Sequence, residues 1–96
     1  MQFLIYHVYP KDNASFRATI GGAYVHCWIN RDDLTAAEQI ARSELDQAEW
    51  VVASLEHCEH VSHDRRPEEP EALACYEQAK QGEPAFVVHA WPNEDD

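Results

Sequence analysis

The alternation of apolar and polar positions is clearest over residues 21–30 and predicts a β-strand there. Successive side chains of a strand point to opposite faces of the sheet. One face of this strand carries the apolar set Val25, Cys27 and Ile29. The other carries the aromatic and half-polar set Tyr24, His26 and Trp28. The first face is typical of a core, and the second needs a cover of some other kind.

Three further segments predict strands. Residues 3–9 carry apolar side chains on both faces, which is typical of a strand covered on both sides. Residues 50–55 form a near-continuous run rich in β-branched side chains, and the strand extends toward residue 60. The last strand, residues 85–91, follows Pro84.

Helical spacing of apolar residues predicts two helices. The first covers about residues 33–47, with Asp32 or Asp33 as its N-cap. A capping box beginning at Thr35 is a competing start slightly later. The second helix has Pro70 in its first turn, where proline is tolerated because the backbone N–H would be unpaired there anyway.

The element order is therefore ββαβαβ, in a single α/β domain of residues 1–91 followed by an acidic C-terminal tail, residues 92–96. Helical crossovers join strands two, three and four, so we expect these three to run parallel in a four-stranded mixed sheet. Crossovers of the same hand would place two helices on one face and leave the other bare. The result is an α/β (α+β) two-layer sandwich that loosely resembles ferredoxin-like domains.

The bare face of this sandwich is the first candidate functional surface. We expect it to present Tyr24, His26 and Trp28, with contributions from Trp50 or Val51 and from strands one and four. A contiguous aromatic surface usually marks a binding or self-association site. Two copies packed sheet to sheet would bury it, and a cover formed by the tail or by residues 10–20 is the alternative. The pattern favours a homodimer over a ligand cleft, because symmetric homo-oligomers are the commonest soluble assemblies.

Charge is divided unevenly along the chain. There are 7 Lys and Arg against 18 Asp and Glu, and the formal net charge of −11 lies entirely in residues 44–96. Such a surface repels phosphate backbones, so no nucleic acid is expected as a partner. No apolar run approaches the roughly 20 residues that a membrane helix needs, so no membrane partner is expected either. An acidic, immunity-like inhibitor of a basic protein partner is a weaker hypothesis, because net charge commonly serves solubility alone.

The cysteines and the N-terminus indicate a compartment. Three cysteines are an odd number without framework spacing, which favours a reducing environment over a disulfide scaffold. The first residues lack the basic start and cleavage site of a signal peptide. We therefore expect a cytoplasmic location.

Residues 57–64 form the second candidate site, because imidazoles, a thiol and carboxylates are concentrated there. Nitrogen and sulfur donors suit zinc, nickel or copper. The candidate metal ligands are His57, Cys58, His60, His63 and His89. The spacing matches no zinc motif, and in an extended segment His57 and His63 would share one face while Cys58 and His60 take the other. A helical turn would instead bring His57 and His60 together, and His63 less well. A polar loop without a metal is the competing interpretation.

No phosphate-binding glycine loop or nucleophile elbow is present, so nothing in the sequence is specific for an enzyme. The patterns together favour a small acidic cytosolic protein that acts as a homodimeric binding or interaction module without catalytic activity. The alternative is a protein that binds a transition metal such as zinc, or a metal- or thiol-dependent enzyme that uses the His57–His63 segment.

Overall fold

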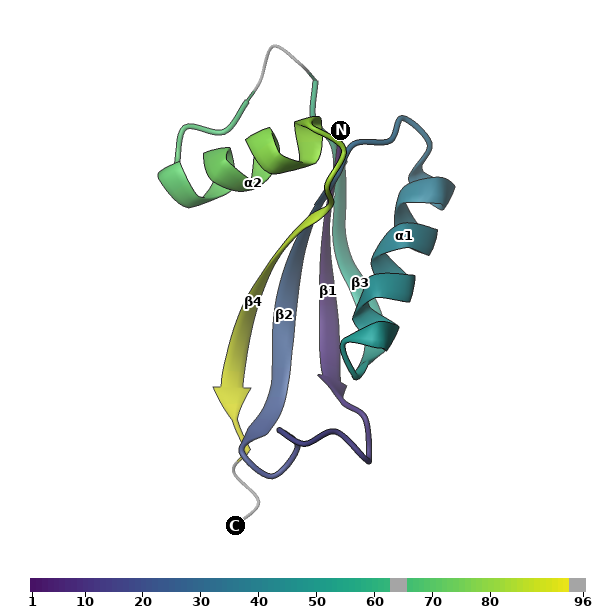
Figure 1. The fold of residues 1–96 in the computed structure, drawn as a ribbon, viewed down its shortest axis with the longest axis vertical. Coiled ribbons are helices and arrows are strands. Elements are labelled where there is room, and N and C mark those ends of the chain that lie inside the picture. The colour runs from purple at the N-terminus through teal and green to yellow at the C-terminus, as the bar shows by residue number, and fades with distance from the viewer. Residues whose placement is uncertain (63–65, 94–96) are drawn as a thin grey trace.

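The computed structural model describes residues 1–62 and 66–93 of the 96-residue chain. Its elements follow the expected ββαβαβ order (Figure 1). They are β1 (Gln2–Pro10), β2 (Ile20–Ile29), α1 (Leu34–Gln47), β3 (Trp50–His60), α2 (Pro70–Lys80) and β4 (Ala85–Pro92). The protein is thus a small α+β fold built on one four-stranded sheet. The last strand runs one residue into the expected tail, of which residues 94–96 lie outside the described residues.

The strands are arranged in the order β3-β1-β2-β4, and all three neighbouring pairs are antiparallel. β2 and β3 both oppose β1, so they run in the same direction, as expected. β4 opposes β2, so the expected mixed sheet with strand four parallel to the others is wrong. The reason is the position of α2, which lies across the end of the sheet where β3 stops instead of running back along it (Figure 1). β4 therefore enters the sheet at that same end.

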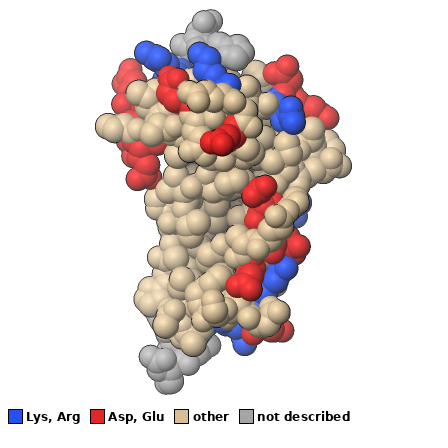
Figure 2. All heavy atoms as spheres, viewed as in Figure 1, with Lys and Arg blue, Asp and Glu red and all other residues tan. Residues whose placement is uncertain are grey.

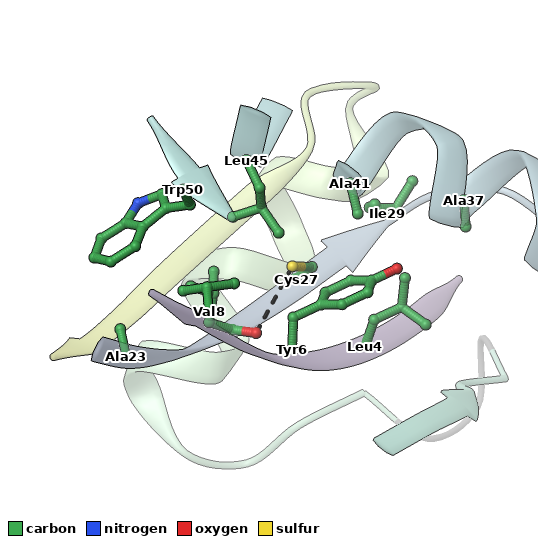
Figure 3. Close-up of a cluster of buried hydrophobic side chains, with 11 residues drawn as sticks. Leu4, Tyr6, Val8, Ala23, Cys27, Ile29, Ala37, Ala41, Leu45 and Trp50 are labelled. Carbon is green, nitrogen blue, oxygen red and sulfur yellow. Dashed lines mark hydrogen bonds between the residues drawn. The ribbon is translucent and has the colours of Figure 1, made fainter. Parts of the chain in front are cut away.

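Helix α1 packs on one face of the sheet and forms the main core (Figure 3). Alternate residues of β1 and β2 reach this core, including Leu4, Tyr6, Val25 and Cys27, all fully buried. Small side chains on the buried stripe of the helix let it approach the strands closely. These residues are Ala37 and Ala41, followed by Leu45 one turn later. The predicted core face of residues 25–29 is confirmed.

Helix α2 packs on the opposite face. Trp28 lies between two core residues of β2, so its side chain points away from α1. It meets Tyr76 of α2 with ring centroids 6.3 Å apart in an edge-to-face arrangement. This second cluster also includes Met1, Ala79 and Ala85. The expectation of both helices on one face is therefore not confirmed, nor is the two-layer sandwich or the ferredoxin-like analogy.

Local signals in the sequence explain where the helices begin and end. Asp33 caps α1 by accepting a hydrogen bond from the Thr35 N–H at 3.0 Å, which decides between the alternative starts. Pro70 occupies the first turn of α2. After that helix, Gly82 adopts a φ of 100°, a conformation that side chains with a Cβ rarely accept.

Candidate functional site

The sheet face opposite α1 gathers the aromatic and imidazole side chains of three strands. Phe3, Ile5 and His7 of β1 lie opposite Trp28, His26 and Tyr24 of β2 in the antiparallel register. β4 continues these rows with side chains opposite His26, Tyr24 and Gly22. We call this surface the histidine–aromatic face. Its members are Phe3, Ile5, His7, Tyr24, His26, Trp28, Val87, His89 and Trp91.

Helix α2 covers only one end of the histidine–aromatic face. Trp28 lies under the helix and is 7% exposed, whereas Tyr24, four residues earlier on the same strand, is 42% exposed. The chain thus supplies a cover for Trp28, contrary to the expectation of a wholly bare face. The end that carries Tyr24 remains open.

At the open end, three rings contact one another. The Tyr24 and Trp91 ring centroids are 5.3 Å apart, and His7 lies 5.4 Å from Tyr24 and 5.6 Å from Trp91. Gly22 makes this arrangement possible, because a Cβ there would lie 2.5 Å from Cζ2 of Trp91. We call His7, Tyr24 and Trp91 the open-end cluster. It presents a nearly uncharged aromatic surface.

At the covered end, a pocket of about 300 Å³ lies between the sheet and the start of α2 and opens to solvent. Phe3, Trp28 and Val87 supply apolar walls, and His26 and His89 supply imidazoles. The helix side contributes the residues Glu69, Glu71 and Ala72. No Lys or Arg among the described residues lines the pocket. It therefore combines aromatic surface with hydrogen-bond acceptors and negative charge.

The two pocket histidines influence each other. Their ring centroids are 4.7 Å apart, and His26 also meets Phe3 edge to face at 5.5 Å. Partial burial lowers the pKa of His26, and the neighbouring His89 lowers it further, while Glu71 and Glu69 act in the opposite direction. Burial disfavours the charged imidazolium, so His26 remains neutral and can accept a hydrogen bond at neutral pH.

The candidate metal ligands are distributed over two faces. His57 lies opposite Ile5 on the histidine–aromatic side, and its Nε2 is 3.7 Å from a carboxylate oxygen of Glu59. Cys58 and His60 lie opposite Leu4 and Gln2, which places them on the α1 side. This alternation is the one expected for an extended segment. His63 lies outside the described residues.

His89 is not brought to this segment. It lies on β4, three strands away from His57 on β3, which is roughly 14 Å at the usual strand spacing. The expectation that it would join the segment depended on a parallel fourth strand, and β4 is antiparallel. Within residues 1–62 and 66–93, no group of three or more His, Cys, Asp or Glu side chains is arranged to hold a metal ion.

The thiols also lie apart from one another. Cys58 is exposed, Cys75 is half-buried on α2 and Cys27 is buried in the main core. Burial raises the pKa of Cys27 to about 12, so its thiolate is essentially absent at neutral pH. His57 precedes Cys58 directly, but alternation along the strand turns its ring to the opposite face of the sheet. His60 shares the face of Cys58 two residues later, and both side chains are exposed there.

Trp50 does not belong to the histidine–aromatic face. It is 8% exposed and packs in the main core, with its ring 4.8 Å from that of Phe16. β3 has two register shifts against β1, between Ile5 and Tyr6 and between His7 and Val8. Each shift inserts an extra residue, so the positions between the two shifts change face and those beyond both shifts do not. Trp50 therefore lies on the α1 side, the same side as Cys58 and His60, as plain alternation along β3 would place it.

Sequence reasoning did not single out several members of the site. These members are His7, Trp91 and the pocket glutamates Glu69 and Glu71. Alternation could have found the first two, since residues 3, 5 and 7 and residues 87, 89 and 91 each share a strand face. The glutamates reach the pocket only because α2 lies across the end of the sheet.

Comparisons of the chain with known protein families, with curated proteins and with solved structures find no match. The fold alone defines its class, a small α+β protein with one antiparallel sheet and one helix on each face over the described residues. None of its helices, over the residues that the structure describes, is both long and apolar enough to span a membrane.

Proposed function

We propose that the protein is a homodimeric interaction module without catalytic activity, in which two copies pack through the open end of the histidine–aromatic face. The observation that carries this proposal is the open-end cluster, where Tyr24 is 42% exposed although it contacts two other rings. Exposed aromatic surface of this kind is typical of association sites. Packing of one sheet against another would remove it from water.

The distribution of charge supports a second copy as the occupant. β1, β2 and β4 contain no Lys, Arg, Asp or Glu, although the chain has a formal net charge of −11. Figure 2 shows the charged side chains gathered over the helices and loops, while the surface over β2 and β4 carries none in that view. Two equally acidic copies would repel each other least where these strands meet. Closed symmetric dimers are also the commonest soluble assemblies.

Mass measurement by light scattering over a range of concentrations tests the dimer. We expect twice the mass of one chain, and a stronger dimer at higher salt because screening weakens the repulsion between the acidic copies. Tyr24→Lys should produce a monomer that remains folded. Val88→Lys is the matched control, because Val88 is 47% exposed on the neighbouring strand but points to the α1 side.

Three outcomes would contradict the proposal. A wild-type monomer at every concentration would remove the dimer altogether. Loss of the dimer in Val88→Lys but not in Tyr24→Lys would move the interface to the other face. A dimer that weakens as salt increases would show that charge pairs hold it together rather than the uncharged strands.

The state of the cysteines bears on the location of the protein in the cell. All three are free thiols, which fits a reducing environment. We propose the cytoplasm. Fractionation of the native host, with the protein detected by antibody, checks this, and recovery outside the cytoplasm would contradict it.

A further inference from the structure

The pocket at the covered end of the histidine–aromatic face has a chemistry that the dimer does not use. We infer that it binds a small organic ammonium ion with an aromatic or similarly flat apolar body. This inference goes beyond the proposed dimer and does not depend on it, because the open-end cluster and the pocket share no residue. It rests on the walls, the acceptors and the charge of the pocket.

The walls suit a flat apolar group. Phe3 and Trp28 lie with ring centroids 4.4 Å apart and an interplanar angle of 36°, and both line the pocket. Val87 completes the apolar lining on the side of β4. Aromatic faces also attract cations through their quadrupole, and the half-buried ring of Phe3 has surface to offer, whereas Trp28 is 7% exposed. A cationic ligand would therefore gain from the same surface that holds its apolar body.

The polar groups of the pocket match an ammonium group. An ammonium has three N–H donors and no acceptor, so it needs acceptors around it. The neutral imidazole of His26 offers one ring nitrogen, with the ring of His89 beside it, and the carboxylates of Glu69 and Glu71 offer oxygens. Neither glutamate forms an ion pair with a Lys or Arg in the described part of the chain. Their charge remains available to a ligand.

The net negative charge around the pocket disfavours binding of anionic ligands. The start of α2 contributes a partial positive charge of about half a unit, which the two carboxylates exceed. No described Lys or Arg lines the pocket to hold an anion. Both glutamates are exposed, so water screens them and each contributes modestly. We therefore expect selectivity for a cation rather than very tight binding.

Three probes of nearly the same shape separate charge from apolar contact. They are phenethylamine, which is a cation at pH 7.4, neutral 2-phenylethanol and anionic 3-phenylpropanoate. Titrations followed by nuclear magnetic resonance should show saturable shifts of the Trp28 indole N–H and the His89 ring with phenethylamine. The Trp50 indole is an internal control, because it lies in the main core on the other side of the sheet. The oligomeric state is measured in the same samples.

Substitutions then test the residues. Glu71→Gln should weaken phenethylamine binding about two- to fivefold, the range for an exposed charge pair, without changing the affinity for 2-phenylethanol. Glu83→Gln is the matched control, since Glu83 is exposed just beyond α2 and does not line the pocket. His89→Phe keeps an aromatic ring but removes the ring nitrogens. It should weaken binding of phenethylamine more than binding of 2-phenylethanol.

Several results would overturn the inference. If 2-phenylethanol bound as tightly as phenethylamine, the pocket would be apolar without a preference for charge. If 3-phenylpropanoate bound more tightly than phenethylamine, the pocket would prefer anions. Absence of any shift at millimolar phenethylamine would remove the site. Saturable shifts with unchanged affinity in Glu71→Gln and His89→Phe would assign binding to other residues. A monomeric protein that still binds phenethylamine selectively would contradict the dimer alone.

Discussion

His26 on β2 and His89 on β4 hold their imidazole rings with centroids 4.7 Å apart and an interplanar angle of 60°. The residues are 63 positions apart in sequence and meet because β4 returns to the outer side of β2. Two imidazolium ions at this separation would repel each other. His89 therefore adds to the effect of burial, which lowers the pKa of His26.

The first prediction concerns stability at mildly acidic pH. The pKa of His26 in the folded protein is lower than the ordinary 6.5, because of burial and of His89 on β4, against the opposite effect of Glu69 and Glu71 on α2. Above pH 6.5 the imidazole is neutral in both states. As the pH falls through 6.5, the unfolded chain takes up a proton that the folded chain does not, so the free energy of unfolding decreases.

Thermal unfolding between pH 7.5 and pH 5.5 checks this prediction. The midpoint temperature of His26→Gln should fall less over this range than that of the wild type. His60→Gln, at an exposed position of β3, should behave as the wild type. An equal fall in all three proteins would mean that other groups cause the acid sensitivity.

The second prediction compares two valines paired across β2 and β4. Val25 is fully buried and Val88 is 47% exposed, and both point toward the α1 side of the sheet. Val25→Ala should lower the free energy of unfolding by about 2 kcal/mol, through lost burial and a residual cavity. Val88→Ala should cost less than about 1 kcal/mol. Urea unfolding measures both losses. If Val88→Ala cost as much as Val25→Ala, the surface around Val88 would be covered, as in a dimer through the α1 side of the sheet.

The third prediction concerns the cap of α1. The Asp33 carboxylate accepts the Thr35 N–H at 3.0 Å. Asp33→Ala should lower the free energy of unfolding by about 1 kcal/mol, the usual value of such a cap. Asp32→Ala changes the same residue type one position earlier and should cost less than about 0.5 kcal/mol. If the two losses were reversed, Asp32 would be the cap.

The fourth prediction concerns the space that Gly22 leaves for Trp91. A Cβ at Gly22 would lie 2.5 Å from one ring carbon of Trp91 and 2.9 Å from another, so the indole would have to shift. Gly22→Ala should cost about 1–3 kcal/mol of stability through overpacking. Most of that loss should disappear when Gly22→Ala is made together with Trp91→Ala, because the obstructing ring is absent. A double-mutant cycle by urea unfolding measures the coupling, and additive losses would place the strain in the backbone.

The fifth prediction concerns thiol reactivity. Cys58 is exposed, whereas Cys75 is half-buried and Cys27 is buried with a pKa of about 12. Burial also raises the pKa of Cys75, with a further contribution from Glu71. A colorimetric disulfide reagent should therefore modify one thiol rapidly in the folded protein and all 3 in urea. Cys58→Ser should remove the rapid phase, and a rapid phase that remains would assign it to Cys75.

Sequence patterns that extend over only a few residues were sufficient to predict where the strands and helices lie. Period-two alternation located β2, a run of apolar side chains on both faces located β1, and the helical spacing of Ala37, Ala41 and Leu45 located α1. The core side of β2 followed from Val25 and Cys27, because a strand in a sheet can turn only alternate side chains inward. These features depend on neighbours within a few residues, which is why the sequence alone determined them.

The tertiary structure decided the direction of β4, the face covered by α2 and the partners of the histidines. The helix lies across the end of the sheet, and its Tyr76 packs on Trp28, so one end of the predicted bare face is covered and only the other is open. His89 consequently meets His26 instead of the His57–His63 segment. Trp50 likewise packs in the main core, where its ring meets that of Phe16 from the loop between β1 and β2. Such outcomes depend on packing between segments distant in the chain, which local periodicity does not encode.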